Sequence, residues 1–273
     1  ATVTWLLLSG NPLFPRRIMG HQPFRLSIWA MMLFSVTAYG FFFLLPIYLQ
    51  QVHGYTTFQS GLILLPGALF AGVATLLSGI LSDRINPKKV AAMCLLGAAV
   101  ASWRFHSDMD TPRELLYLDY ICWGFFIGGA FAPITLLALG TLEERDVANG
   151  STLVNVSRLV AGSIGTSYAT SLLSIKKDSF YEALSANLTW GNPALDELLS
   201  RFSIYAGNTT VAFDPDTWHR LLFQAKQILL VRAASYAFEA TYEYLALFPL
   251  AALVCVVLVK GNSNHRGIKP PLH

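Results

Sequence analysis

Two ionisable residues lie inside long apolar stretches of this sequence. Asp119 belongs to the stretch 115–142, and Arg158 belongs to the stretch 152–173. Charged side chains are costly inside a membrane, and they are tolerated mainly where they face other protein groups or a water-filled cavity. Arg158 is therefore expected to line a cavity, where it would pair with a carboxylate or assist proton coupling. The alternative is an arginine whose head group extends back to the membrane surface.

Asp119 comes only a few residues after the start of its apolar stretch. We therefore expect it near one face of the membrane, where it would take up protons or contact a cation. The alternative, which its position favours, is an interfacial carboxylate in contact with water. Because Arg158 is expected toward the opposite face, the sequence does not predict a salt bridge between the two.

A second pair of charges follows another apolar stretch. Gly79 precedes Asp83 and Arg84, and two lysines follow at 88 and 89. A carboxylate and a guanidinium at a helix end can hold one helix to its neighbour and release it when the helices move, and we call this arrangement a conformational latch. The alternative is a basic loop that only sets the orientation of the helices in the membrane.

Small residues and prolines are placed where they would pack or bend membrane helices. Gly128, Gly162 and Gly165 allow neighbouring helices to approach closely. Pro66 and Pro133 lie within apolar stretches and are expected to bend their helices.

The remaining reactive residues do not form a familiar site. The six histidines lie outside the apolar stretches and lack the spacing of metal ligands, and no nucleophile or phosphate-binding motif is present. The net charge of +3 is not arranged as a basic stripe with interleaved aromatics, as a nucleic-acid partner would require. The sequence therefore predicts no metal, no cofactor and no enzymatic activity; an intramembrane enzyme stays open as a disfavoured alternative.

The composition indicates a multi-pass integral membrane protein. Hydrophobic residues make up 54% of the chain and charged residues only 13%, whereas a soluble domain has about 25% charged residues. The expected fold is an all-α bundle of six transmembrane helices. Their predicted ranges are 26–49, 61–81, 90–103, 115–142, 152–173 and 244–259. The third range is short for a crossing, which needs about 20 residues, so a half-inserted segment is the alternative there.

The order of these segments predicts a simple organisation. Residues 1–25 form a lead-in, 26–173 hold the first five helices, 174–243 form a long insertion, 244–259 form the last helix, and 260–273 form a tail. Within the insertion, residues 217–232 have the spacing of an amphipathic helix.

Basic residues are distributed unevenly between the short connections, and this asymmetry predicts the orientation. One side holds Arg16, Arg17, Arg25, Arg84, Lys88, Lys89, Arg145, Lys260, Arg266 and Lys269, and the other holds Arg104 and Arg113. Because cytoplasmic loops carry the excess of Lys and Arg, both ends are expected in the cytoplasm and the insertion outside it.

Several stretches resemble a known family. The segment 79–89 is similar to the loop motif of the major facilitator superfamily, with Asn86 where that motif usually has Gly and Pro87 in place of a basic residue. The segments 41–50 and 61–66, and the run from Asn149 to Thr166, resemble the EmrB/QacA-type drug:proton antiporters, as does a long insertion before the last helix.

This resemblance covers about residues 23–167 and the final helix. That family has fourteen helices, as two six-helix halves with an extra pair between them, and this chain resembles the carboxy-terminal half. The resemblance implies export of hydrophobic, often cationic, small molecules in exchange for protons, with a missing amino-terminal half as the partner in the lipid bilayer. It also favours a bacterial inner membrane and a coupling role for Arg158. A non-transporting scaffold or channel bundle is the alternative.

Since the sequence begins at Ala1 without an initiator Met, we expect a piece of a longer protein.

Overall fold

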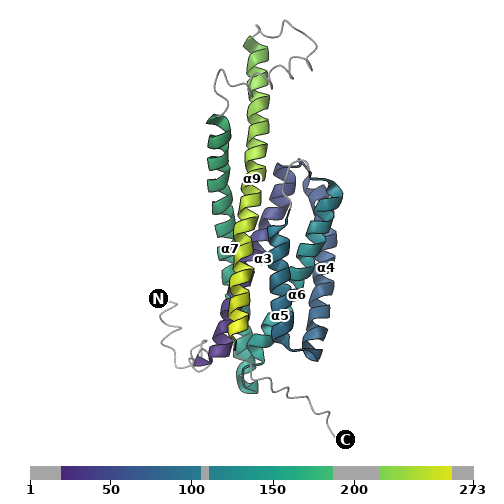
Figure 1. The fold of residues 1–273 in the computed structure, drawn as a ribbon, viewed down its shortest axis with the longest axis vertical. Helices are drawn as coiled ribbons and strands as arrows, with labels where there is room; N and C mark the ends of the chain where they lie inside the picture. The colour runs from purple at the N-terminus through teal and green to yellow at the C-terminus, as the bar shows by residue number, and fades with distance from the viewer. Residues whose placement is uncertain (1–19, 106–110, 187–214, 260–273) are drawn as a thin grey trace.

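Six helices make up almost all of the part of the chain that the structure, a computed structural model, describes. The described residues are 20–105, 111–186 and 215–259. The helices are α3 (Gln22–Gln51), α4 (Thr57–Arg84), α5 (Pro87–Trp103), α6 (Arg113–Leu139), α7 (Glu144–Ala186) and α9 (Pro215–Leu258). They run alternately up and down, so that α3 begins and α9 ends at the same end of the bundle (Figure 1). The prediction of an all-α, six-helix bundle is confirmed.

Capping side chains set the start of α4 and the start of α5. Thr56 begins α4 with a capping box, in which its hydroxyl accepts from the Gln59 backbone N–H and its own N–H donates to the Gln59 side chain. At the other end, Asn86 caps α5 by accepting from the Lys88 backbone N–H at 2.9 Å. Pro87 then occupies the first turn of α5, where a missing N–H costs nothing. Asn86 therefore begins α5 directly after Ile85, the C-cap of α4.

The centre of the bundle is α3, which packs against α6, α7 and α9. A group of large aromatic side chains fills the core around Phe41. Its ring stacks on Trp123 of α6 at 4.7 Å and on Tyr242 of α9 at 4.2 Å between centroids. Phe105 packs edge-on against Tyr242 at 5.1 Å. These contacts join α3, α6 and α9 by burial of aromatic surface.

Glycines allow two helix pairs to approach backbone to backbone. A Cβ atom on Gly128 of α6 would collide with the backbone of Ala71 of α4, and one on Gly165 of α7 would collide with the backbone of Val36 of α3. The hydroxyl of Thr75 donates to the Gly128 carbonyl at 2.8 Å across the first of these contacts. Small residues are the usual means of close helix packing in membranes.

The prolines and Gly162 complete this packing. Pro66 and Pro133 lie inside the continuous helices α4 and α6, and Gly162 faces the ring of Tyr39.

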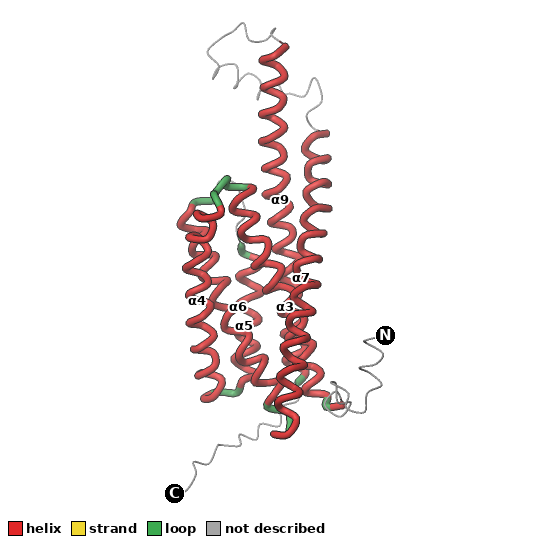
Figure 2. Tube along the Cα trace, turned by 180° about the vertical axis from the view of Figure 1, so that it is seen from behind, coloured by secondary structure: helices red, strands yellow, loops and turns green. Residues whose placement is uncertain are grey.

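Two helices extend well beyond the bounds expected for membrane spans. The sequence predicts helices at 152–173 and 244–259 with an insertion between them, but α7 continues to Ala186 and α9 begins at Pro215. With 43 and 44 residues, each helix is about 65 Å long. The two rise together above the rest of the bundle (Figures 1 and 2). The amphipathic helix predicted at 217–232 is part of α9, and the middle of the insertion, 187–214, lies outside the described residues.

Contacts between side chains hold α7 and α9 together along this length. Tyr168 meets Phe248 at 5.5 Å, and Phe180 meets Tyr236 at 5.9 Å between ring centroids. No Gly or Pro interrupts residues 166–186 or 216–248. The helices continue because nothing in the sequence ends them, although their mean hydropathy falls. We call residues 174–186 of α7 and 215–243 of α9 the α7–α9 extension.

Within the described residues, four helices are long and apolar enough to cross a membrane: α3, α4, α6 and the part Leu229–Leu258 of α9. The remaining two helices, α5 and α7, are not in this group, each for its own reason. Helix α5 has 17 residues, about 25 Å of helix, and α7 carries many hydroxyl side chains. Residues 1–19 of the predicted lead-in and the tail 260–273 lie outside the described residues.

Candidate functional site

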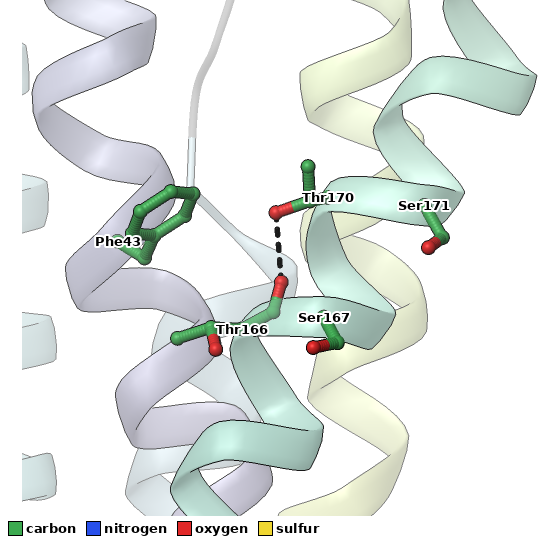
Figure 3. Close-up of a pocket in the computed structure, with 5 residues that line it drawn as sticks. All are labelled: Phe43, Thr166, Ser167, Thr170 and Ser171. Atoms are coloured by element: carbon green, nitrogen blue, oxygen red, sulfur yellow. Dashed lines mark hydrogen bonds between the residues drawn. The ribbon is translucent and has the colours of Figure 1, made fainter.

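A groove lies between α3 and α7, with a volume of about 370 Å³. One wall is Phe43 of α3, and the other consists of four hydroxyl side chains of α7 (Figure 3). These are Thr166, Ser167, Thr170 and Ser171. Because residues three and four positions apart share a face of a helix, this spacing places them along one stripe of α7.

Two of the hydroxyl hydrogens in this stripe are already donated to carbonyls of the helix itself. Thr166 donates to the Ser163 carbonyl at 3.0 Å, and Thr170 donates to the Thr166 carbonyl at 2.8 Å. A hydroxyl oxygen keeps acceptor capacity after its hydrogen is committed. The groove therefore offers a large aromatic surface on one side and hydrogen-bond acceptors on the other.

Arg158 lies two turns before this stripe on α7 and is half-buried. Its Nη2 donates to Asn155 Oδ1 at 3.0 Å, and its Cζ lies 5.7 Å from the ring centroid of Phe131 on α6. Its Nε is buried without a hydrogen-bond partner, and it forms no ion pair with a described carboxylate. The arginine is held by an amide and an aromatic ring, while its charge is not neutralised by the described part of the chain.

Asp119 and Arg158 are not brought together. Asp119 is half-buried in the second turn of α6, and Arg158 contacts Phe131, twelve residues further along the same helix. That separation corresponds to about 18 Å along the helix axis. The two residues therefore belong to different levels of the bundle.

The expected latch residues lie at the end of α4. Asp83 and Arg84 are exposed and form no ion pair within the described residues. Gly79 has open space around it, so no described helix packs against it.

A residue of this loop that sequence analysis did not single out, Lys88, does reach another helix. Its Nζ donates to the carbonyls of Val257 and Val259, at 2.7 and 2.8 Å, and so caps the end of α9. Lysine side chains bind favourably to the last carbonyls of a helix. Because Lys88 and the end of α9 are far apart in the sequence, this pairing could not be predicted from the sequence.

A second group that the sequence does not reveal lies between the end of α3 and the start of α6. Tyr48 is fully buried, and its hydroxyl lies 3.0 Å from Nε2 of His53. The imidazole stacks on Tyr55, whose hydroxyl accepts from Nε of Arg113 at 3.4 Å. Burial lowers the pKa of His53 from its ordinary value of 6.5.

The chain is similar to known proteins in both sequence and fold. The family model of the Major Facilitator Superfamily matches residues 3–166. The uncharacterised MFS-type transporter YhcA of Bacillus subtilis (strain 168) is 28% identical over 93% of this chain and 44% of its own length. The multidrug export protein EmrB of Escherichia coli (strain K12) is 26% identical over 73% of this chain and 39% of its own length.

A further relative and a solved structure agree with these matches. A multidrug resistance protein B homolog of Mycobacterium tuberculosis (strain H37Rv) is 32% identical over 60% of this chain and 31% of its own length. The crystal structure of a bacterial homolog of the human lysosomal transporter Spinster, inward-facing and occupied, superposes with a TM-score of 0.64 at 16% identity. That match covers 94% of this chain and 54% of the solved one.

The chain thus spans less than half the length of these three curated relatives. The family model covers more than half of the chain, and the helical fold and apolar composition agree with it. The chain is an integral membrane protein and belongs to the major facilitator superfamily of transporters.

Proposed function

We propose that this chain is the carboxy-terminal half of a proton-coupled secondary transporter that exports hydrophobic or cationic small molecules. The observation that carries this proposal is the exposed polar stripe of α7 with the un-neutralised Arg158 beside it. Lipid offers no hydrogen bonds to such a surface. The stripe is therefore covered by water or protein, as a face on a transport path would be.

The partner that covers this face is a second six-helix half of the same transporter. Arg158 has an unmet donor at Nε, and placing a guanidinium at the bilayer centre costs about 2.5–3.5 kcal/mol on insertion scales. A carboxylate from the partner half, or a carboxylate that exchanges protons, would satisfy that donor. Arg158 is accordingly assigned to coupling.

The groove fits the proposed substrate class. Phe43 supplies apolar and π surface, and the threonine and serine oxygens supply acceptors. Hydrophobic cations make favourable contacts with both. The names of two relatives, a multidrug export protein and a multidrug resistance protein homolog, support the same class.

Two further assignments follow from position. Asp119, in the second turn of α6, would take up protons near the outer face of a bacterial inner membrane. The exposed pair Asp83 and Arg84, with Gly79 before it, would latch α4 to the partner half on the cytoplasmic side, where both termini of the chain would lie.

The test uses the full-length transporter that carries this chain, reconstituted in vesicles with an imposed proton gradient. Arg158→Ala is expected to abolish proton-driven efflux, and Arg158→Lys to recover part of it, because Lys keeps the charge but lacks the planar fork of donors. The matched control is Arg232→Ala, which removes an exposed arginine from the α7–α9 extension.

Two outcomes count against the proposal in different ways. Normal efflux by Arg158→Ala would show that Arg158 is not needed for coupling and would indicate that it anchors α7 at the membrane surface. Flux through the unmodified protein that ignores the proton gradient would favour a channel bundle and overturn the transport mechanism itself.

A further inference from the structure

A second pocket lies where the end of α5 meets α9. It has a volume of about 210 Å³ and is lined by Trp103, Glu243, Tyr244 and Leu247. Trp103 is 63% exposed and Tyr244 is 41% exposed, so both rings present much of their surface outward. Glu243 is exposed and forms no ion pair within the described residues. None of these residues belongs to the α3–α7 groove.

The register between α5 and α9 places this pocket at one boundary of the membrane. At one end Lys88 of α5 holds the carbonyls of Val257 and Val259 of α9. Fifteen residues further along α5 comes Trp103, and fifteen residues back from Leu258 comes Glu243. The two antiparallel helices therefore cover the same distance, about 22 Å, between the lysine and the pocket.

The two ends of this stretch of α5 and α9 have residues that are typical of a membrane surface. Lysine reaches its charge out of the hydrocarbon at one end. At the other, Trp103 and Tyr244 are the amphipathic aromatics that concentrate at the level of lipid headgroups. The hydrocarbon layer is about 30 Å thick and thins locally around shorter helices. The pocket consequently lies where headgroups meet acyl chains, on the side of the α7–α9 extension.

The chemistry of the pocket suits an ammonium group. Aromatic faces attract organic cations, and the carboxylate of Glu243, which pairs with no cation among the described residues, supplies the opposite charge. The ring of Tyr244 already has one such contact, because Nζ of Lys176 lies 5.0 Å from its centroid. An anionic headgroup would be repelled by Glu243.

Cations stand next to the pocket. Arg104 follows Trp103 directly and is exposed, and Lys176 lies against Tyr244 from α7. These side chains suit a phosphate adjacent to the ammonium, while Leu247 continues the pocket toward the acyl region. We propose that the α5–α9 pocket binds the headgroup of a zwitterionic phospholipid, with the ammonium against Glu243, Trp103 and Tyr244. This site does not depend on the proposed transport activity.

The test compares lipid binding to the purified full chain by native mass spectrometry. The probes are phosphatidylethanolamine and phosphatidylglycerol with identical acyl chains, which differ in the ammonium group. We expect a preference for phosphatidylethanolamine on the order of tenfold from the combined charge and π contacts. Glu243→Gln and Trp103→Leu should each reduce it severalfold.

Matched controls separate a site from a general surface effect. Asp178→Asn removes an exposed carboxylate of α7, and Trp29→Leu removes an exposed tryptophan of α3; both should keep the preference. Thermal unfolding of each variant checks the fold. Equal binding of the two lipids by the unmodified chain, or an unchanged preference in both Glu243→Gln and Trp103→Leu, would overturn the proposal. Displacement by soluble tetramethylammonium at equal concentration would assign the pocket to free cations instead of lipid.

Discussion

The contact of α3 with α7 at Gly165 makes a quantitative prediction about stability. A Cβ atom placed there would lie 2.7 Å from Cα and 2.9 Å from the carbonyl carbon of Val36, with the carbonyl oxygen closer still. Carbon atoms pack at about 3.5–4.0 Å, so Gly165→Ala requires the helices to separate by about 1 Å. Because the obstacle is backbone, rotation of a side chain cannot relieve the collision.

Two opposing terms decide how Gly165→Ala changes the free energy of unfolding. Overpacking a tight interface costs about 1–3 kcal/mol. Replacing Gly by Ala within a helix returns about 1 kcal/mol of propensity. Gly72 of α4 isolates the second term, since a Cβ there meets no atom within 4 Å. Gly165→Ala should therefore be less stable than Gly72→Ala by about 1–3 kcal/mol.

The assay is reversible unfolding of each variant by titration of denaturing detergent in mixed micelles, followed by circular dichroism. Gly72→Ala should match or exceed the stability of the unmodified chain, and Gly165→Ala should fall below it. If the two variants unfold at the same detergent fraction, the close approach of α3 and α7 does not exist as described. A loss in both would show that Gly72 is also covered in the protein.

Two other contacts predict measurable responses. Because burial lowers the pKa of His53 below 6.5 in the folded state, the unfolded chain binds more protons; stability should fall as pH drops below about 6.5 toward the folded pKa. His53→Gln should flatten this change in melting temperature between pH 7.5 and 5, and an unaltered pH dependence would assign it to other groups. Lys88→Met should lose the cap on α9, weakening that end by about 0.5–1.5 kcal/mol. Faster hydrogen exchange at residues 255–259, rescued by Lys88→Arg, would support this, and unchanged exchange would contradict it.

Hydrophobic length alone located most of the bundle. The predicted ranges 26–49, 61–81 and 115–142 differ by a few residues from α3, α4 and α6, because an apolar run must be buried or in lipid wherever it occurs. The α7–α9 extension was missed for a definite reason. Lys176, Lys177 and Asp178 lower the hydropathy of α7, and this fall was the basis for the predicted end of the span. A fall in hydropathy does not end a helix, and no Gly or Pro follows before Gly191.

The partners of the candidate site could not be predicted from the sequence. The position of Arg158 within its apolar stretch led to two alternatives, a cavity-lining residue or one that extends to the membrane surface, and neither named its contacts. Its contact with Phe131 depends on the rotation of α6 against α7, which the packing of the whole bundle decides. Lys88 was missed as a bridge to α9 for the same reason: the pairing joins segments 169 and 171 residues apart.

The α7–α9 extension has a mechanical consequence. Gly165 is the point where α7 rests against α3, and Ala186 lies about 31 Å further along the same helix. A tilt of α7 by about 10° around this point would move Ala186 by about 5 Å. A small tilt of α7 against α3 would thereby be magnified along the extension, where the contact of Phe180 with Tyr236 couples the two helices. Spin labels on the extension would therefore report such tilts as an enlarged displacement.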